Sequence, residues 1–311
     1  MSIEEVNSVF EQPWWLEAVA PGRWAAAEVV EDGKLQARMP YVLGCRGGKV
    51  IATMPPLTQT LGVWFRPQEG GKYVNWLSRR GELLRSLIGQ LPCKNVDLTL
   101  DSAVDYVLPF RWQGFRCEPS FSYRFTNLTD VEALFRGVKD SRRSEIKKAG
   151  KMLTVRDDRS VDVLIDMMRC TFRRQGRQGV VDEALVRRLD EACREHHASR
   201  LLVAEDADGR VQGAAYFVYD ARCCYYLAGG ANPEYRGSGA QSLLIWEGIK
   251  FASSVSRMFD FEGSMIEDIE RNFRSFGSGF VVNYRVRRLG LLPELMDAAK
   301  PYVKRLIGYK N

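Results

Sequence analysis

The chain has 311 residues, of which 45% are hydrophobic and 27% charged, so it can form a sizeable core and is not expected to be disordered. Its seven cysteines are an odd number without C-x-x-C spacing, which predicts reduced thiols in a cytoplasmic protein rather than a disulfide framework or a zinc site. The formal net charge of +6 fits either an ordinary solvated surface or a surface for a polyanion such as coenzyme A, a nucleotide-sugar or tRNA.

The first residues, Met1–Glu5, are acidic and are not followed by the apolar region of a signal peptide. No apolar run approaches the ~20 residues of a membrane-spanning helix. We therefore expect neither a leader nor a membrane span.

The N-terminal half, residues 1–128, is expected to follow the order β-β-β-α-β-α-β, and Asp32-Gly33 and Gly47-Gly48 provide turns between its first three strands. Strands are predicted at Trp24–Val30, Leu35–Leu43, Lys49–Thr53, Val96–Leu100 and Phe121–Thr126, and helices at Gly81–Gln90 and Ala103–Trp112. We expect the tryptophans of this half to pack in the core or a groove rather than to form a stacking platform; they include Trp14, Trp15, Trp24, Trp64 and Trp76.

A long basic helix at residues 129–150 is expected to link the two halves. Thr129-x-x-Glu132 is a capping box that can begin it. Arg142, Arg143 and Lys147 follow, and the last two lie one helical turn apart and project together. A solvated helix face is the ordinary interpretation of this cluster, and a site for the acceptor or for a polyanion is the alternative.

The C-terminal half, residues 151–311, has the predicted order β-α-α-β-β-β-α-β-α-β. Ser160 and Asp182 can cap its first two helices. Strands are predicted at Lys151–Arg156, Arg200–Ala204, Val211–Tyr219, Cys223–Ala228, Met258–Glu262 and Phe280–Arg287, and further helices at Ala240–Ser253, Ile266–Phe276 and Pro293–Ile307. The same element order is typical of the Gcn5-related N-acetyltransferase (GNAT) fold, and the N-terminal half repeats its later part.

A glycine-containing loop leads from a strand into the helix at Ala240. Exposed backbone N–H groups and the positive end of the helix dipole make such a turn an anion site. Gly237 and Gly239 would let a phosphate approach the backbone, and Arg236 adds a charge. A plain glycine-rich loop with a surface arginine is the alternative.

Two carboxylates lie at the end of a predicted strand. Because side chains alternate along a strand, Asp260 and Glu262 are expected to share one face. Buried carboxylates are costly unless they are paired or functional, so both are candidate catalytic residues. The alternative is a structural salt bridge, for which Arg236, Arg271 and Arg274 are the expected partners.

Tyr226 lies on the neighbouring predicted strand and is a candidate general acid, although a half-buried packing role is more common for a strand tyrosine. Gly229 and Gly230 at the end of this strand indicate a bulge or a close approach of the backbone. Backbone N–H groups from Leu227 to Gly230 are therefore candidates for binding the donor.

Several segments together resemble the FemAB-like acyltransferases of the GNAT superfamily, which have tandem GNAT domains. The resemblance is sharpest between residues 139 and 285 and rests on Ser141–Ala149, Gly229-Gly230 with Arg236 and Ala240, Leu243–Lys250, Phe259–Ser264 and Ile269–Gly277. Met54–Gln59 and Gly62 resemble the proline-containing loop of that family more weakly. The resemblance implies an α/β protein with mixed α+β sheets, in which tandem GNAT-like domains pack around a shared cleft.

The chain departs from the acetyl-CoA signature Arg/Gln-x-x-Gly-x-Gly/Ala at one position. Arg236–Ala240 fits the signature, but Gln241 stands where the last glycine or alanine is expected. The donor therefore stays open between acyl-CoA and aminoacyl-tRNA, and no other cofactor is implied.

The function that the resemblance implies is transfer of an acyl or aminoacyl group from an activated ester to an amine of a small molecule or peptide in a bacterial cell. A non-catalytic nucleic-acid or nucleotide-sugar binding protein is the alternative, and an occluded gap between the strands at Cys223–Ala228 and Met258–Glu262 would favour it. The only two histidines, His196 and His197, are adjacent on a predicted helix, so a Ser-His-Asp mechanism and a metal site are poorly supplied.

Overall fold

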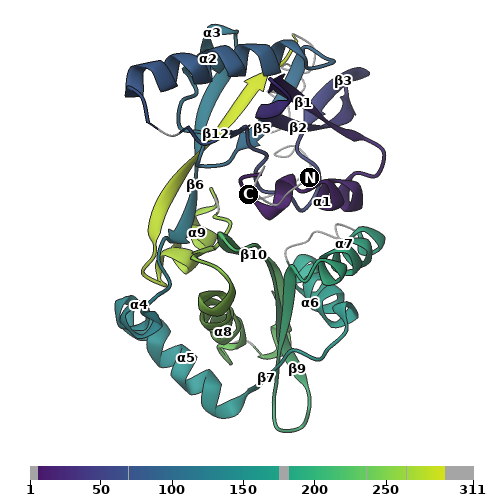
Figure 1. The fold of residues 1–311 in the computed structure, drawn as a ribbon. Coiled ribbons are helices and arrows are strands. Elements are labelled where there is room, and N and C mark those ends of the chain that lie inside the picture. Colours follow the sequence, from purple (N-terminus) through teal and green to yellow (C-terminus); the bar gives the residue numbers. More distant parts are fainter. Residues whose placement is uncertain (1–5, 69, 175–181, 236, 264, 291–311) are drawn as a thin grey trace. The chain divides into compact units, whose positions relative to one another are not determined.

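A computed structural model describes residues 6–68, 70–174, 182–235, 237–263 and 265–290. The described chain divides into two compact units (Figure 1). One unit contains the residues up to Ser120 and the final described segment from Val282, and the other contains Phe121–Val281. The predicted helix at residues 293–307 lies outside the described residues.

The first unit contains a mixed sheet with strand order β1-β2-β3-β5-β12, and β4 pairs with Ala37 and Arg38 in the N-terminal part of β2. Neighbouring strands are antiparallel except for β3 and β5, which are parallel. The elements are a 3₁₀ turn Val9–Glu11, α1 (Pro13–Val19), β1 (Trp24–Glu31), β2 (Lys34–Arg46), β3 (Lys49–Thr53), β4 (Trp64–Phe65), α2 (Tyr73–Gly89), β5 (Asn95–Leu100), α3 (Leu108–Trp112) and β12 (Gly279–Arg288).

The second unit contains a mixed sheet with strand order β6-β11-β10-β9-β8-β7, in which only β10 and β11 are parallel. The elements are β6 (Arg116–Phe125), α4 (Val131–Gly137), α5 (Asp140–Met152), β7 (Thr154–Arg156), α6 (Val161–Arg174), α7 (Glu183–Glu195), β8 (Ser199–Glu205), β9 (Val211–Tyr219), β10 (Cys223–Ala231), a 3₁₀ turn Pro233–Tyr235, α8 (Ala240–Val255), β11 (Met258–Asp260) and α9 (Glu267–Arg274).

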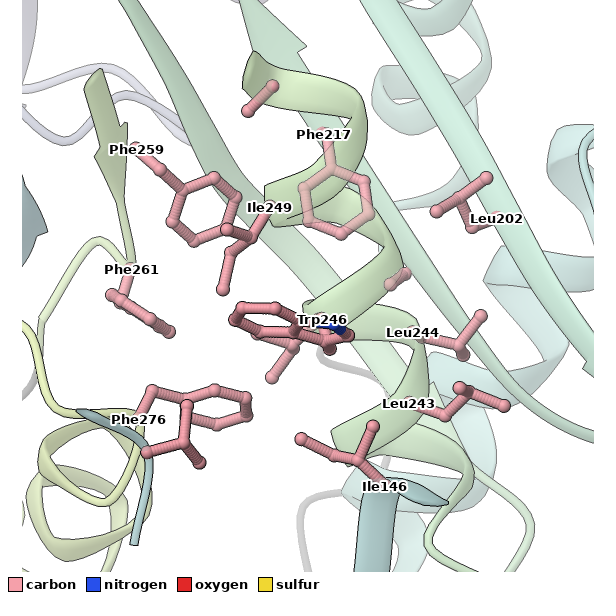
Figure 2. Packing of buried hydrophobic residues seen from close by; sticks show 14 of the residues in the cluster. Ile146, Leu202, Phe217, Leu243, Leu244, Trp246, Ile249, Phe259, Phe261 and Phe276 are labelled. Atoms are coloured by element: carbon pink, nitrogen blue, oxygen red, sulfur yellow. The ribbon is translucent and has the colours of Figure 1, made fainter. Parts of the chain in front are cut away.

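Helices cover both faces of the sheet in the second unit, with α8 on one side of β9 and β10, and α6 and α7 on the other (Figure 1). The middle strand β9 is consequently buried along Gln212–Val218, on both of its faces. Phe217 faces α8, where Gly248 leaves room for its ring. Figure 2 shows this ring in one cluster with Trp246, Ile249, Phe259 and Phe261.

The two units repeat one sheet plan, which confirms the duplication that the element order predicts. Three antiparallel strands, β1-β2-β3 or β8-β9-β10, are followed by a helix and then by a parallel strand, β5 or β11. A further antiparallel strand lies beyond the parallel one, β12 in the first unit and β6 in the second.

These last strands are exchanged between the two halves of the sequence. We expected β6 to end the sheet of residues 1–128 and β12 to end the sheet of residues 151–311. Instead, Arg124 and Phe125 of β6 pair with β11, and Tyr284–Arg288 of β12 pair with β5. The division into units therefore differs from the expected boundary at residues 129–150, which lie wholly inside the second unit.

The expected single linking helix is two helices, because Val138 and Lys139 have extended backbone between α4 and α5. The N-cap of α4 is Asp130 rather than Thr129, and its carboxylate accepts the backbone N–H of Ala133 at 2.8 Å. The break allows α5 to pack along α8 independently of α4.

Within the described part of the chain, no helix combines the length and the apolar character needed to cross a membrane. In the same residues, no group of three or more His, Cys, Asp or Glu side chains is arranged to hold a metal ion.

Candidate active site

The candidate site begins where the two parallel strands of the second unit stop pairing. Cys223–Tyr225 of β10 pair with Met258–Asp260 of β11, and the pairing ends there, as expected of strands that diverge. The register of β10 against β9 shifts between Tyr226 and Ala228, so Leu227 is the extra residue of a bulge. The bulge confirms the signal that the glycines at 229 and 230 provide in the sequence.

Tyr226 is held next to the first turn of α8. The side-chain Nε2 of Gln241 donates a hydrogen bond of 2.6 Å to the Tyr226 hydroxyl oxygen. The Cα of Gly229 lies directly beside both groups, so any larger residue there would collide with them. Burial raises the pKa of Tyr226 well above its ordinary value, and the nearby Glu262 carboxylate raises it further, while the Gln241 bond lowers it. The phenol therefore stays protonated at neutral pH and can act as a proton donor.

Gln241 was not among the predicted site residues. In the sequence it stood out only because it departs from the acetyl-CoA signature. Its amide oxygen Oε1 is buried and has no hydrogen-bond partner among the described residues. An orphaned buried acceptor costs free energy, about 1–3 kcal/mol, unless a bound group satisfies it. An N–H donor such as an amine substrate would satisfy it.

Glu262 lies beyond the end of β11, not on the strand as predicted. Its φ of +58° is in the left-handed region, which is uncommon for a residue with a side chain and costs roughly 1–2 kcal/mol. Asp260 and Glu262 therefore do not share a strand face. The next residue, Gly263, also has a positive φ and packs tightly against the backbone of Phe121 and Ser122 in β6, so the turn is held in place.

Asp260 forms a buried ion pair within the sheet of the second unit. The carboxylate is 2% exposed, and its Oδ2 accepts a hydrogen bond of 2.7 Å from Arg124 Nε. Its Oδ1 accepts from the Ser122 hydroxyl and from the Glu262 backbone N–H at 2.7 Å. Both oxygens are thus occupied, which favours the salt-bridge interpretation for Asp260, with β6 supplying the partner.

Two of the three arginines that were expected to partner Asp260 are paired with other carboxylates. Arg271 pairs with Glu267, and Arg274 pairs with Glu270 at 3.1 Å. Arg236 lies outside the described residues.

The predicted anion-binding loop is closely packed against α5. Gly237 and Gly239 both have positive φ, and Gly239 is the N-cap of α8. A Cβ on Gly239 would lie 2.9 Å from Glu145 Cγ and 3.1 Å from Ala149 Cβ. The Glu145 carboxylate also accepts a hydrogen bond of 3.0 Å from Ser242 in the first turn of α8. Gly239 thus allows α5 to approach the start of α8, and the Glu145 carboxylate already lies at the positive end of the α8 dipole.

Aromatic rings bridge the diverging strands. The ring of Phe273 from α9 lies 6.1 Å from Tyr226 of β10 and 5.5 Å from Phe261, which follows β11. The ring centres of Phe261 and Phe276 are 5.3 Å apart, and Figure 2 shows the two rings next to each other. The gap between β10 and β11 is therefore filled by side chains.

The basic residues of α5 have different environments. Arg142 has an 18% exposed side chain that donates to Ser275 at 3.0 Å and to Glu145 at 2.6 Å, and it also bonds to Ser242 and Asn272. It thereby ties α5 to α8 and α9. The Arg143 guanidinium is bonded to Asp140 and to a backbone carbonyl.

Lys147 is exposed, and its ammonium lies 5.8 Å from the centre of the Phe135 ring. Lys148 and Lys151 on the same helix are also exposed. The charge available to a polyanion on α5 is therefore that of its lysines rather than that of Arg142.

Comparisons with known proteins give one family match and several similar folds. Residues 136–264 match the family described as acetyltransferase (GNAT) domain. The crystal structure of FemX is similar with a TM-score of 0.66 and 12% identity, covering 90% of this chain and 93% of FemX. The C-terminal domain of a putative lysylphosphatidylglycerol synthetase from Agrobacterium fabrum is similar with a TM-score of 0.54, 12% identity and 89% coverage of both chains.

The structure of L-PGS from Bacillus licheniformis is similar with a TM-score of 0.53 and 12% identity, covering 100% of both chains. No curated protein matches the sequence significantly. At these identities the likenesses establish a shared fold.

Proposed function

We propose that this chain, an acyltransferase of the GNAT superfamily with the fold of FemX, transfers an aminoacyl group from an activated ester to an amine. The observation that carries the proposal is the cluster of Tyr226, Gln241 and Glu262 at the point where β10 and β11 part. A neutral proton donor, a carboxylate and an orphaned amide oxygen lie together there, beside a bulged backbone.

The chemistry requires that a C–N bond form and the C–O bond of the ester break. The amine N–H is held by Gln241 Oε1, and the Glu262 carboxylate accepts the proton that the amine loses. Backbone N–H groups between Leu227 and Gly230 polarise the ester carbonyl. The Tyr226 hydroxyl gives its proton to the departing oxygen, and a proton passing from Glu262 to Tyr226 restores the starting state.

The fit of acyl-CoA to this site is poor. The helix end expected to bind its phosphates is in contact with Glu145, and the signature position is occupied by Gln241, whose amide bonds to Tyr226. The gap between the strands is filled by the rings of Phe261 and Phe273. These observations support an aminoacyl-tRNA donor, whose polyanionic part can remain outside the gap and meet the lysines of α5.

The donor is tested by incubating the full-length protein with radiolabelled aminoacyl-tRNA or acyl-CoA and a panel of amines. We expect transfer from the tRNA ester alone. Binding of the tRNA should weaken steeply with salt, and Lys147→Glu should reduce the slope of log K against log salt by about 1–2. Transfer from acyl-CoA alone would overturn the choice of donor while leaving acyl transfer intact.

A second candidate function is non-catalytic binding, and the filled gap between β10 and β11 is the observation that favours it. Ligand binding without transfer from either donor would support this alternative.

Glu262→Gln is expected to fold normally and to transfer at least ~100-fold more slowly, because the carboxylate that accepts the amine proton is lost. Single-turnover transfer and a melting curve measure the two properties. Asp260→Asn is the contrasting variant: it breaks a buried ion pair and should lose roughly 3–5 kcal/mol of stability. Transfer by Glu262→Gln at the parental rate would remove Glu262 from the mechanism.

A further inference from the structure

A stack of planar groups lies on the first turns of α2, in the unit that does not contain the transfer site. The rings of Tyr73 and Trp76 are 5.7 Å apart and 28° from parallel. The guanidinium carbon of Arg80 is 3.7 Å from the centre of the Trp76 ring and 4.7 Å from that of Phe65. The spacing 73, 76 and 80 places the three helical residues on one side of α2.

The inner end of this stack is fixed. Arg80 has a 16% exposed side chain, and its guanidinium pairs with Asp105 at 3.2 Å while lying between two rings. A planar cation held between aromatic rings has little freedom to move, and the contact is favourable in itself. Trp76 is partly buried rather than in the core, although packing in the core or in a groove was expected of it.

The outer end of the stack is open. Tyr73 is 70% exposed although one face of its ring lies on Trp76, and Val74 beside it is 60% exposed. Because an exposed aromatic ring keeps apolar surface in water, covering the outer face of Tyr73 with another flat group would be favourable. The position next to Tyr73 can receive one more flat ring.

A cationic side chain immediately precedes the ring in the sequence. Lys72 immediately precedes Tyr73, is exposed, and makes no ion pair with any described residue. Arg79, one residue before Arg80, is instead paired with Glu31 and Glu82. A flat ring with a negative charge nearby satisfies both features, and nucleobases linked to phosphate have this chemistry.

We propose that the open face of Tyr73 is a stacking site for a nucleobase whose phosphate is bound by Lys72. The base belongs either to an unpaired stretch of RNA or to a free nucleotide. The site involves none of the residues assigned to acyl transfer, so binding at it can be tested independently of that activity.

The test measures binding of three probes to the full-length protein by fluorescence anisotropy or calorimetry. The probes are a short single-stranded oligo-adenylate, ADP, and an oligomer of equal length that has the ribose-phosphate backbone without bases. We expect the base-bearing probes to bind more tightly than the abasic one. Binding of the oligo-adenylate without ADP identifies RNA as the source, and comparable affinity for both identifies a nucleotide.

Four variants separate stacking from charge. Tyr73→Ala should weaken binding of the base-bearing probe about 5- to 150-fold, as expected for the loss of one stacked base. Tyr73→Phe retains the ring and should bind like the parent, as should Val74→Ala, which removes an adjacent exposed apolar side chain. Lys72→Glu should weaken every probe that carries phosphate. Equal affinity of the parent and Tyr73→Ala, or equal affinity for abasic and base-bearing oligomers, would overturn the proposal.

Discussion

The hydrogen bond between Gln241 and Tyr226 joins the first turn of α8 to the bulged strand β10. Gln241→Met keeps the size and removes both the donor to Tyr226 and the orphaned acceptor. We expect little change in the melting temperature and a fall of about fivefold in single-turnover transfer, since one lost hydrogen bond is worth about 1 kcal/mol. The amine concentration needed for half-maximal rate should rise as well, because Oε1 is proposed to hold the amine.

Gln241→Glu supplies the control for this variant. It retains an acceptor oxygen for the amine and loses the N–H donor to Tyr226. An effect on transfer equal to that of the methionine variant would show that the bond to Tyr226 matters and that the orphaned oxygen does not.

The buried carboxyl of Glu11, at the start of the first unit, should make the stability of the protein depend on pH. Burial raises the pKa of its carboxyl from 4.5 to about 7, with a contribution from Asp101, although the backbone N–H groups of Asn7 and Gly62 donate to it at 2.9 and 2.8 Å. The folded state favours the protonated form, so its stability is full below pH 4.5 and decreases as the pH rises towards 7. This rise in the pKa corresponds to a loss of up to about 3 kcal/mol in the free energy of unfolding once Glu11 is ionised.

Glu11→Gln should remove this part of the pH dependence. Unfolding followed by tryptophan fluorescence between pH 5 and 8 measures it, because six of the seven tryptophans lie in this unit. The exposed Glu82→Gln is a suitable control. A pH profile of Glu11→Gln parallel to that of the parent would contradict the assignment.

At the scale of elements, a glycine at the start of α8 permits the close approach of α5. Gly239→Ala would place a methyl group within 3.1 Å of Ala149 and closer to Glu145, and overpacking of this kind costs about 1–3 kcal/mol. Gly237→Ala is the matched control, because its φ is also positive and nothing described lies within 4 Å of the added group. Denaturant unfolding should show a larger loss for residue 239 than for residue 237.

At the scale of the whole molecule, the exchanged strands make the two halves of the sequence interdependent. Buried Asp97 of β5 accepts two hydrogen bonds of 2.7 Å from Arg285 of β12. Burial alone would raise the pKa of Asp97, but these bonds and the bond from Arg46 lower it overall. A fragment of residues 1–128 contains the carboxylate without its main partner and the sheet without its last strand.

We therefore expect fragment 1–128 to lack a cooperative unfolding transition. The same fragment joined by a flexible linker to residues 279–290 should regain one, as measured by circular dichroism and tryptophan fluorescence on heating. Cooperative unfolding of fragment 1–128 alone would mean that β12 is dispensable for the first unit.

Most of the element order could be predicted from the sequence, because it depends on local signals, although β4 and the division of the linking helix into α4 and α5 could not. Hydrophobic periodicity and turn dipeptides such as Asp32-Gly33 identified the first three strands of each sheet, and the glycines at 229 and 230 indicated the irregular end of β10. Signals carried by neighbouring residues are readable without the fold. Even so, α2 begins at Tyr73 rather than Gly81, and α1 was not predicted, because helix boundaries depend on tertiary packing.

Which distant residues contact each other could not be predicted from the sequence. Arg124 and Asp260 lie 136 residues apart, and β12 pairs with a strand almost two hundred residues before it. The local pattern of residues does not identify such distant partners. Strand pairs and ion pairs depend on the free energy of the whole folded chain. The same reason explains why Glu262 was placed on a strand: the alternation rule holds only while the strand continues, and a tight turn packed against β6 ends β11 at Asp260.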